Sequence, residues 1–476
     1  MNDVPLHKKS AIEISTMVHT KQMSAEEVVK TILGHINRAN CEVNAFALIC
    51  DQQAMKDARE IDRKIRQGQE VLPLAGVPFT VKDLIPTKGI ETASGSFVMQ
   101  GNIPTTDADP VMQLKKAGAI LIGKSTTAEL GSDVFTNTKR YGTTRNPWNT
   151  EHHSGGSSGG AAAAVAAGMG PIAISTDGGG SARIPASCCG VLGMKPTLGL
   201  VPNEMWALKF DTFTSIGANT RTSADLAAML TVINNSHPYD PWTAGRSRIQ
   251  FSVRSEPVEN LAGLRILYVP TMGNRIVDKN VNVLVEDALS VLSNAGAKIE
   301  LAPSDFAWHS PSGRDAFCAT YNARFGHLLA GYRHVMSDAI VSLIELGANV
   351  PSNTIAKASL ERAELFTRVQ KLFDNADLIV SPTLSAPAPL CKSDSREMME
   401  INGEPVGPFR QAWCPYSQTF NHTGHPAITI PVGFSAGLPV GLQAVAPYFA
   451  DQALIDLAAA IEELIPWTDA WPETAG

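Results

Sequence analysis

Short apolar runs alternate with segments of helical spacing along most of the chain. The expected strands are the apolar, often β-branched runs at 75–81, 119–123, 171–175, 264–269, 378–383, 427–432 and 440–445. Expected helices lie between them, including those near 24–33, 109–117, 157–167 and 223–233. Strands separated by helices predict an α/β fold, in which a large mixed, mostly parallel twisted sheet is flanked by helices on both faces.

The second half of the chain departs from this alternation. From 308 to 373 the pattern is almost wholly helical, and the last apolar runs follow it. This order predicts a helical insertion over 308–375, placed before the final strands return to the sheet. The polar stretch 246–256 carries turn-forming residues, and we expect it to be a surface linker.

The composition is that of a globular protein with a large core. The 476 residues are 44% hydrophobic and 18% charged, which excludes a disordered or fibrous chain. The chain has 39 lysines and arginines against 46 acidic residues, a formal net charge of −7, and it contains no basic tract. We therefore expect no direct nucleic-acid partner.

Three features bear on the location of the protein. The seven cysteines are odd in number and include no Cys-x-x-Cys pair, which is typical of reduced thiols in a cytoplasm. The first ten residues, MNDVPLHKKS, lack the apolar core of a secretion signal. The most apolar stretch, 161–174, is interrupted by glycines and a proline and falls short of the ~20 residues that a spanning helix needs. These features predict a cytoplasmic, non-membrane protein.

Two clusters rich in glycine and serine lie close together in the sequence, GGSSGG at 155–160 and DGGGS at 177–181. A small-residue helix and an apolar strand lie between them, so a flexible linker is a poor interpretation of either cluster. Glycine tolerates backbone conformations that other residues avoid. Glycines around serines therefore favour a bent backbone that presents N–H groups.

An anion is the natural ligand of such a backbone. A phosphate loop would require a lysine after its glycines, and neither cluster has one. A dinucleotide fingerprint would require a strand before Gly155, where the polar residues 151–153 stand instead. An oxyanion fits better, because successive N–H groups could converge on one negative oxygen from Gly178, Gly179, Gly180 and Ser181.

Two serines are candidate nucleophiles. Residues 155–159 match the letters of a nucleophile elbow around Ser157, but we expect no buried strand before that serine. Ser181 follows an apolar strand and a glycine turn, so it is the better placed nucleophile. A serine hydroxyl is weakly nucleophilic and needs a neighbouring base.

The residues alone leave the identity of that base open. Four histidines lie in loop-like or motif-rich segments, although each is more easily explained as structural or solvent-facing: His152, His153, His422 and His425. Lys82 ends an apolar strand and could act as a base if burial lowered its pKa towards neutrality. A lysine at the end of a strand is otherwise usually a surface residue.

The motifs between Gly76 and Pro202 closely resemble the amidase signature family. They are VKD at 81–83, NPW at 146–148, GGSSGG at 155–160, DGGGS-x-R-x-P at 177–185 and CGVLGMKPT at 189–197. Weaker family-like segments recur as SPT at 381–383 and FNHTGHP at 420–426. The resemblance covers most of the chain in the expected order. It implies a single amidase domain over 1–476, a signature core over 70–202 that carries the catalytic residues, and a substrate-side position for the 308–375 insertion.

This resemblance implies a Ser-Ser-Lys triad. Ser181 is the expected nucleophile, Ser157 the bridging serine that relays its proton, and Lys82 the neutral general base. In the family the bridging serine follows a cis peptide bond, which here would join Gly156 to Ser157. The reaction implied is acyl transfer through a seryl acyl-enzyme.

The resemblance also assigns supporting roles. The backbone N–H groups expected to form the oxyanion hole are those of Gly178, Gly179 and Gly180. Asp177 and Arg183 flank the nucleophile turn and are expected to hold its geometry. Leu130 and Ser132 are expected near the bound scissile group. The family chemistry requires no metal or organic cofactor.

The family also contains the subunit that generates ammonia for transamidation of mischarged tRNA. Such subunits carry an Arg-Arg-containing segment and a later acidic residue that helps to hold glutamine. The corresponding stretches here, 345–350 and 409–415, have no obvious equivalents. We therefore expect a free-standing hydrolase of small aryl or aliphatic amides, with esters and carbamates as side substrates. Aromatic residues of the variable segments are candidates for the pocket wall: Trp206, Phe210, Phe213, Phe325 and Trp413.

Two other functions stay open at this point. One is a glutamine-hydrolysing amidotransferase subunit, which needs a partner chain. The other is an inactive homologue that holds an anion in the glycine loop. The expected partner is a small amide, ester or carbamate, and homodimers are common in the family, so a homodimer is a further expectation.

Overall fold

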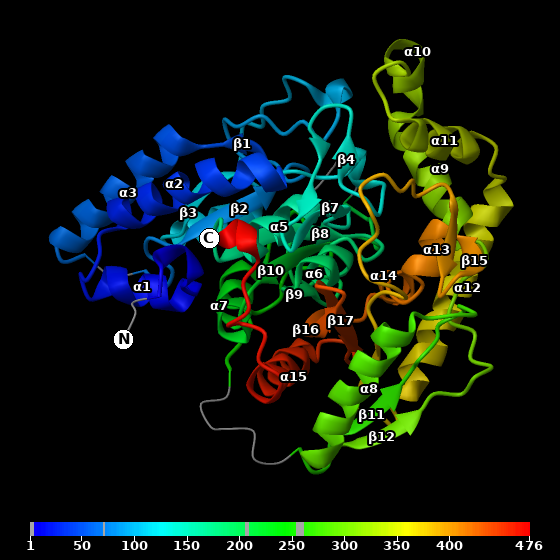
Figure 1. Cartoon of the computed structure of the whole chain (residues 1–476). Coiled ribbons are helices and arrows are strands. Elements are labelled where there is room, and N and C mark those ends of the chain that lie inside the picture. Colours follow the sequence, from blue (N-terminus) through cyan, green and yellow to red (C-terminus); the bar gives the residue numbers. More distant parts are fainter. Residues whose placement is uncertain (1–3, 70–71, 205–208, 254–260) are drawn as a thin grey trace.

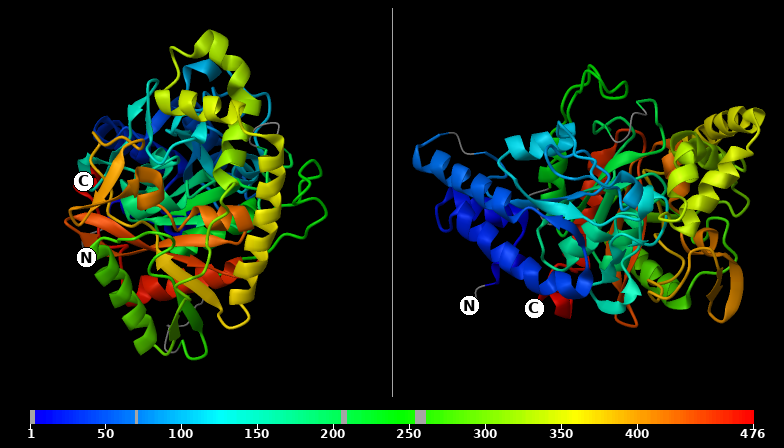
Figure 2. Two further views of the ribbon diagram at one scale, coloured as in Figure 1. Left: turned by 90° about the vertical axis from the view of Figure 1, so that its right-hand side faces the viewer. Right: turned by 90° about the horizontal axis from the view of Figure 1, so that it is seen from above.

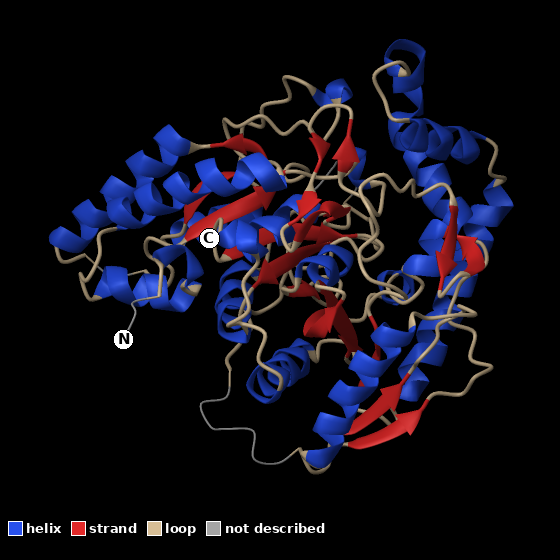
Figure 3. Cartoon of the chain, in the orientation of Figure 1, coloured by secondary structure: helices blue, strands red, loops and turns tan. Residues whose placement is uncertain are grey.

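The structure is a computed structural model, and it describes residues 4–69, 72–204, 209–253 and 261–476. Its centre is an eleven-stranded sheet with the strand order β1-β3-β2-β8-β10-β9-β16-β17-β13-β11-β12. Helices surround this sheet, as Figure 3 shows with helices in blue and strands in red. The predicted α/β fold with a large mixed sheet and flanking helices is therefore confirmed.

The strands of the large sheet are β1 (Phe46–Ile49), β2 (Pro78–Lys82), β3 (Ile120–Ser125), β8 (Ile172–Asp177), β9 (Leu192–Lys195), β10 (Ser215–Thr220), β11 (Arg265–Tyr268), β12 (Lys298–Leu301), β13 (Leu378–Pro382), β16 (Ala427–Ser435) and β17 (Leu438–Val445). Three small two-stranded sheets pair β4 (Asn137–Thr138) with β5 (Gly142–Thr143), β6 (Arg145–Asn146) with β7 (Asn149–His153), and β14 (Met398–Ile401) with β15 (Glu404–Pro408).

The α-helices of the described residues are α1 (Ala11–His19), α2 (Ala25–Val43), α3 (Asp51–Arg66), α4 (Asp109–Lys116), α5 (Gly159–Ala166), α6 (Arg183–Cys189), α7 (Ser223–Ile233), α8 (Lys279–Asn294), α9 (Gly313–Phe325), α10 (Leu329–Tyr332), α11 (Asp338–Ala348), α12 (Ser352–Leu372), α13 (Phe409–Trp413), α14 (Gln418–Thr423) and α15 (Asp451–Leu464). None of the helices in the described ranges is both long and apolar enough to cross a membrane. All seven cysteines are free thiols.

The strands and helices expected from the apolar pattern are present. At the start of α2 the side chain of Ser24 accepts a hydrogen bond from the N–H of Glu27, and the Glu27 carboxylate accepts one from the N–H of Ser24, so this helix opens with a capping box. The pattern missed four strands of the large sheet: β1, β9, β10 and β12. They are short, and β9 (LGMK) and β10 (SIGANT) contain small and polar residues that weaken a strand signal.

Antiparallel neighbours dominate the sheet, which corrects the expectation of a mostly parallel one. The parallel pairs are β2–β3, β2–β8, β11–β12 and β11–β13. The other neighbouring pairs of the eleven strands run antiparallel. The difference arises because β16 and β17 form a hairpin and because β9 and β10 insert beside β8. Strand direction depends on these connections, which hydrophobic periodicity does not reveal.

Helices cover both faces of the sheet. Helices α5 and α6 pack against each other and together contact β2, β8, β9, β10, β16 and β17. Helix α7 packs against β8 and β10 from the other face, and α4 and α15 pack against α7. Every residue of α5 is buried, and its sequence, GGAAAAVA, is small enough for close approach to the sheet.

Helices α9 to α12 lie between β12 and β13 in the chain, which matches the helical pattern seen there in the sequence. They form the right-hand edge of the molecule in Figure 1, opposite α1, α2 and α3, and Figure 2 shows the same separation from above. Residues of α9 and α11 form a small apolar core that is separate from the main core, and Leu130 also belongs to it. This core links the helical segment to the loops at the edge of the sheet.

The middle of the sheet determines where its polar residues meet. Strands β2 and β8 are parallel neighbours, with Val81 beside Ile174. Parallel strands end at the same edge of a sheet, so the end of β2 at Lys82 lies close to the end of β8 at Asp177. The loop that follows Asp177 and the glycine-rich loop that precedes α5 both open at this edge.

Candidate active site

Lys82 reaches from the end of β2 towards three hydroxyl groups. Its Nζ lies 2.8 Å from Ser157 Oγ, 2.7 Å from Ser158 Oγ and 2.9 Å from Thr176 Oγ1. The side chain is fully buried. In the described part of the chain, no carboxylate forms an ion pair with it.

Burial lowers the pKa of Lys82 well below its ordinary value, because desolvation disfavours the charged ammonium, and the negative charge of Asp177 offsets this effect only in part. The amine is therefore biased towards its neutral form. A neutral amine can accept a proton, which the hydroxyl of Ser157 is placed to give.

Two other lysines are buried in the same region of the fold. Lys124 donates to the carbonyl of Ile85 and to two threonine hydroxyls, and burial lowers its pKa to about 8. Lys195 donates to the carbonyl of Pro196, and burial lowers its pKa to about 7. Of the three, Lys82 is the one that bonds to serine hydroxyls. Contacts distinguish Lys82 from the other buried lysines, whereas burial does not.

The peptide bond between Gly156 and Ser157 is cis, as the resemblance implied. Ser157 lies at the wall of a cavity that it shares with Ser181. The two loops are also joined through their backbones, because the N–H of Ser158 donates to the carbonyl of Ser181 at 3.2 Å. Ser181 is partly exposed, and no described residue hydrogen-bonds to its hydroxyl.

The turn between Asp177 and Ser181 presents backbone N–H groups to the same cavity. The N–H of Gly180 donates to Asp177 Oδ1 at 2.8 Å, so the structure does not support its expected place in an oxyanion hole. Within the described residues, the N–H groups of Gly178, Gly179 and Ser181 have no protein acceptor. These three donors remain for an anionic oxygen.

Gly180 requires the absence of a side chain. Its φ of +110° lies in a region that favours glycine, and a Cβ at this position would lie 2.4 Å from Ser417 Oγ. Ser417 in turn donates to the carbonyl of Gly179 at 2.8 Å. Two hydrogen bonds therefore fix the turn, one from Ser417 to the carbonyl of Gly179 and one from the N–H of Gly180 to Asp177.

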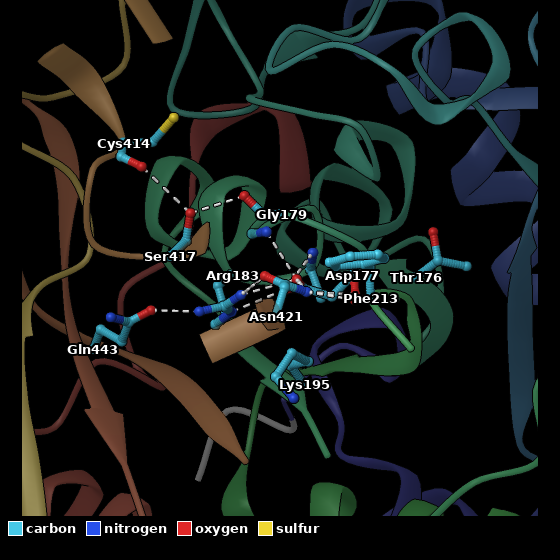
Figure 4. A network of polar contacts seen from close by, with 12 residues as sticks. Thr176, Asp177, Gly179, Arg183, Lys195, Phe213, Cys414, Ser417, Asn421 and Gln443 are labelled. Carbon is cyan, nitrogen blue, oxygen red and sulfur yellow. Dashed lines mark hydrogen bonds and ion pairs between the residues drawn. The ribbon is translucent and has the colours of Figure 1, made fainter. Parts of the chain in front are cut away.

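Asp177 and Arg183 form a buried ion pair at the base of the turn (Figure 4). Arg183 Nε and Nη2 each lie 2.9 Å from the Asp177 carboxylate. The same guanidinium donates to Gln443 Oε1 and Asn421 Oδ1, each at 2.7 Å, and Asn421 donates back to Asp177. Although burial alone would raise the pKa of Asp177, the charge and hydrogen bonds of Arg183 outweigh it and hold the pKa below its usual value.

The cavity wall combines the two serines with residues from distant parts of the chain. Residues of the turn and of Leu130–Gly131 form one side, and α9 contributes Phe317, Thr320, Tyr321 and Arg324. Arg410, from α13, also lines the cavity, and so do Leu84, Thr176, Asp211, Phe213 and Thr214. The cavity holds about 50 Å³, so it is far smaller than the pockets that bury a drug-sized ligand.

Leu130 and Ser132 lie in the same loop but differ in their contacts. Leu130 lines the cavity, has a positive φ of +50°, and accepts a hydrogen bond at its carbonyl from the hydroxyl of Tyr321. The side chain of Ser132 instead donates to the carbonyl of Glu129, while its own carbonyl accepts from Arg410. Leu130 therefore contacts the cavity directly, and Ser132 reaches it through Arg410.

The aromatic candidates separate in the structure. Phe213 lines the cavity. Phe325 lies in the small helical core and Trp413 in the main core, so neither forms the wall. Phe210 is 78% exposed. Trp206 lies outside the described residues.

No histidine of the described chain bonds to Ser157 or Ser181. His152 bonds to the carbonyl of Ala388, and His153 stacks on Phe135 with ring centroids 4.1 Å apart. His422 contacts Phe213, and His425 bonds to Thr423 and Gln370. Burial lowers the pKa of His422 to about 4 and that of His425 to about 3. The four histidines considered from the sequence thus contact other residues and are not placed to act as the base.

Several residues of the site were not identified from the sequence. Ser158 and Thr176 are adjacent to Ser157 and Asp177 in the motifs, so their proximity could have been anticipated. Asn421 lies in the family-like FNHTGHP segment, which carried no assigned role. Tyr321 and Arg410 enter the site from α9 and α13, and no local pattern marks them.

Comparisons with known proteins match nearly the whole chain. A profile of the family described as Amidase matches residues 27–455. The acylamidase of Rhodococcus erythropolis is 33% identical over 479 residues, covering 99% of this chain and 98% of that protein. A glutamyl-tRNA(Gln) amidotransferase subunit of Maridesulfovibrio salexigens is 31% identical over 488 residues, covering 97% and 98%. Among solved structures, a bacterial aryl acylamidase of the amidase signature family superposes with a TM-score of 0.91 at 30% identity, covering 99% of each chain.

Proposed function

This chain belongs to the amidase family and is an amide-hydrolysing enzyme, and from that premise we propose that it cleaves the C–N bond of small aryl or aliphatic amides through a seryl acyl-enzyme. The observation that carries the proposal is the contact of 2.8 Å between buried Lys82 and Ser157, at a cavity that Ser157 shares with Ser181. This arrangement supplies a nucleophile and a base in one place.

Three residues carry the chemistry in this proposal. Ser181 attacks the carbonyl carbon, and its proton passes through the Ser157 hydroxyl to Lys82. Burial supports this assignment, because it favours the neutral amine that can take up the proton. The hydroxyl of Ser158 and that of Thr176 hold the amino group in place from its other sides.

The tetrahedral intermediate places a negative charge on the former carbonyl oxygen. We assign its stabilisation to the N–H groups of Gly178, Gly179 and Ser181, which have no protein acceptor among the described residues. Asp177 and Arg183 support this hole indirectly: Asp177 accepts from the N–H of Gly180 and so fixes the turn. Such preorganised donors cost little reorganisation during the reaction.

The reaction then has two steps. In the first, the intermediate collapses, Lys82 returns the proton through Ser157 to the leaving amine, and the C–N bond breaks. In the second, water attacks the acyl-enzyme, its proton follows the same route, and the acid leaves Ser181 free. Esters and carbamates pass through a similar tetrahedral oxyanion, and we propose them as side substrates.

The wall of the cavity supports an aryl or apolar acyl group on the substrate. Leu130, Phe213, Phe317 and Tyr321 provide apolar surface next to the two serines. Since the cavity holds only about 50 Å³, binding of an anilide requires side chains of this wall to move. The α9 side chains belong to the 308–375 segment, which supports its proposed position on the substrate side.

A glutamine-hydrolysing amidotransferase subunit is the second candidate function. It is favoured by the 31% identity to the Maridesulfovibrio salexigens amidotransferase protein over nearly the full chain. The absence of an Arg-Arg segment and of the later acidic residue from the sequence stretches noted above argues against it. Release of ammonia from glutamine distinguishes this function from the first.

The test is a hydrolysis screen of the purified protein with anilides, aliphatic amides, aryl esters, carbamates and glutamine. Wild type, Ser181→Ala and the control Ser290→Ala are compared, because Ser290 is an exposed serine on α8. We expect anilide hydrolysis by wild type and the control, with a loss of at least about 10³-fold in Ser181→Ala. Hydrolysis of glutamine alone would favour the second function. A failure to hydrolyse any substrate or to react at Ser181 with a covalent serine probe would favour an inactive anion-binding homologue.

A further inference from the structure

Arg410 is a charged residue of the cavity that has no role in the proposed chemistry. Arg410 is the second residue of α13, and its guanidinium lies against the turn that holds Ser181. A Cβ placed on Gly179 would be 3.1 Å from Arg410 Nη2. The side chain also lines the cavity shared by Ser157 and Ser181. A cation therefore stands beside the proposed oxyanion hole.

The protein uses only part of the bonding capacity of Arg410. Its Nη1 donates to the carbonyl of Ser132 at 3.1 Å, and its guanidinium lies 5.9 Å from the centre of the Phe317 ring. No other side-chain hydrogen bond and no ion pair of Arg410 is formed within the described ranges. A guanidinium carries five N–H donors, so most of them face the cavity or its solvent.

The nearby acids form no ion pair with Arg410 within the described residues. Asp133 accepts from the hydroxyl of Ser395 at 2.9 Å, and although burial raises the pKa of Asp133, this hydrogen bond and the charge of Arg410 oppose that rise. Asp211 is the carboxylate of the cavity wall. Burial lowers the pKa of Arg324 and of Arg362, and the charge of Asp211 opposes this lowering. Within the described residues, no carboxylate thus forms an ion pair or a hydrogen bond with Arg410.

Arg183 provides a contrast on the opposite side of the same turn. Its guanidinium is bound by Asp177, Asn421 and Gln443, and it is fully buried. The protein therefore engages Arg183 in four hydrogen bonds and leaves Arg410 with free donors at the cavity. Arg410 is half-buried and forms no ion pair with any described residue, and the free donors of a planar guanidinium match a carboxylate in a bidentate manner.

We propose that Arg410 binds a carboxylate of the substrate, so that the preferred substrates are amides that carry an acidic group near the scissile bond. This inference rests on the proposed function, because it places the acidic group in the same cavity as Ser181. The carboxylate belongs either to the acyl part or to the amine part of the substrate. The experiment below separates these two sources.

Equilibrium binding to the Ser181→Ala protein tests the inference without turnover. Each probe with a carboxylate is paired with a neutral probe of similar shape. 4-Acetamidobenzoate carries its carboxylate on the amine part, and 4-nitroacetanilide is its neutral partner. Succinanilate carries its carboxylate on the acyl part, and levulinanilide is its neutral partner. We expect at least one carboxylate probe to bind about tenfold or more tightly than its neutral partner, as measured by calorimetry.

The variant Ser181→Ala/Arg410→Gln is expected to lose this difference between paired probes. The matched control is Ser181→Ala/Arg396→Gln, because Arg396 is an exposed arginine that pairs with Asp394 outside the cavity. The control is expected to keep the difference. Arg410→Lys retains the charge without the planar fork and is expected to give an intermediate value. Equal binding of paired probes by Ser181→Ala, or an equal loss for both probes in the Arg410→Gln protein, would overturn the inference.

A second measurement covers the case in which the Arg410→Gln protein does not fold. The affinity of the carboxylate probe for Ser181→Ala is measured at low and high ionic strength, and the neutral probe serves as the reference. We expect salt to weaken binding of the carboxylate probe more than that of the neutral probe, since screening reduces charge attraction. The same salt dependence for both probes would contradict the inference.

Hydrolysis by the unmodified protein separates this inference from the proposed function. If neutral anilides are hydrolysed through Ser181 but paired probes bind equally, the proposed function stands and the role of Arg410 is wrong. If carboxylate probes bind through Arg410 but no amide is hydrolysed, the anion site stands and the proposed hydrolysis is wrong. If Arg410→Gln lowers hydrolysis of acidic and neutral anilides by the same factor, Arg410 stabilises the transition state or the turn, and carboxylate recognition is wrong.

Discussion

The amino group of Lys82 lies 2.8 Å from the hydroxyl of Ser157, and both side chains are buried. An ammonium ion at this position has lost its water and has no carboxylate bound to it within the described residues, whereas a neutral amine is satisfied by three hydroxyl groups. The pair is therefore suited to moving a proton in the direction of the lysine.

The pH dependence of hydrolysis should report Lys82. Because the protonated lysine cannot accept a proton, kcat/KM is expected to fall as the pH drops through the lowered pKa of Lys82 and to level off above it. Replacement of Lys82 by Met should reduce kcat/KM by about 10³-fold or more. Steady-state kinetics on an anilide across the pH range measure both effects.

Lys124→Met is the matched control for this prediction, since Lys124 is also fully buried but bonds to Ile85 and to threonine hydroxyls. The folded control should retain the decline at low pH. If the decline disappears in Lys124→Met and persists in a Lys82 variant with measurable activity, Lys82 is not the base.

Lys82 should also make stability depend on pH. The pKa of Lys82 in the folded protein lies below the value of about 10.4 for an unfolded lysine. At pH values between these two pKa values, the lysine is protonated in the unfolded chain and neutral in the folded protein. The free energy of unfolding is therefore expected to rise with pH across this interval, and Lys82→Met should lose that contribution. Urea unfolding of both proteins at neutral and alkaline pH tests this. Identical pH slopes would show that Lys82 is not held neutral in the folded state.

Ser157 and Ser158 both bond to Lys82, but only Ser157 lies on the cavity wall. If Ser157 relays the proton, Ser157→Ala should lower kcat by about 10²–10³-fold. Ser158→Ala removes a contact of the same lysine without interrupting the path to Ser181, so its kcat should fall less. Kinetics at saturating anilide compare the two variants. Equal losses would indicate that both serines only hold Lys82 in place.

The ion pair of Asp177 with Arg183 should govern stability in acid. Arg183 holds the folded pKa of Asp177 below the unfolded value near 3.9, so the stabilisation is complete above that value and is lost as the pH falls below it. Arg183→Met leaves the buried carboxylate without its partner and should cost about 3–5 kcal/mol. The free energies of unfolding of Asp177→Asn, of Arg183→Met and of the double variant Asp177→Asn/Arg183→Met together give the coupling energy of the pair. Strictly additive effects would contradict a direct interaction.

Gly180 and Gly437 separate backbone conformation from crowding. Both have positive φ values, +110° and +78°, but a Cβ on Gly180 would meet Ser417 Oγ at 2.4 Å, whereas one on Gly437 would meet nothing within 4 Å. Gly437→Ala should cost about 1 kcal/mol from its φ alone. Gly180→Ala should cost clearly more and should also impair hydrolysis, because it displaces the turn. Thermal unfolding and anilide kinetics measure these effects, and equal destabilisation would show that Ser417 yields without cost.

The sequence predicted more of the fold than of the site. The apolar runs identified β2, β3, β8, β11, β13, β16 and β17, because a buried strand needs a continuous apolar segment. They did not reveal strand direction or β10, whose residues, SIGANT, give little apolar signal. Local pattern also left the base open between Lys82 and four histidines, and only the family resemblance selected Lys82.

The residues missed by the sequence reach the site over long separations. Asn421 and Gln443 bond to Arg183 from more than 200 positions away, as their contacts with a residue of α6 require the whole sheet to be assembled. Arg410 lies in the stretch 409–415, and no local pattern there marks an arginine that faces a cavity. The place of such residues depends on tertiary packing, which no local spacing encodes.

In the proposed mechanism, hydrolysis proceeds through an acyl group on Ser181. The most direct measurement combines release of 4-nitroaniline from 4-nitroacetanilide with mass spectrometry of the protein quenched during turnover. We expect wild type to release nitroaniline and to carry an acetyl group on Ser181, and we expect Ser181→Ala to lose at least about 10³-fold in rate and to carry no acetyl group. Full activity in Ser181→Ala, or an acetyl group on a different residue, would contradict this mechanism.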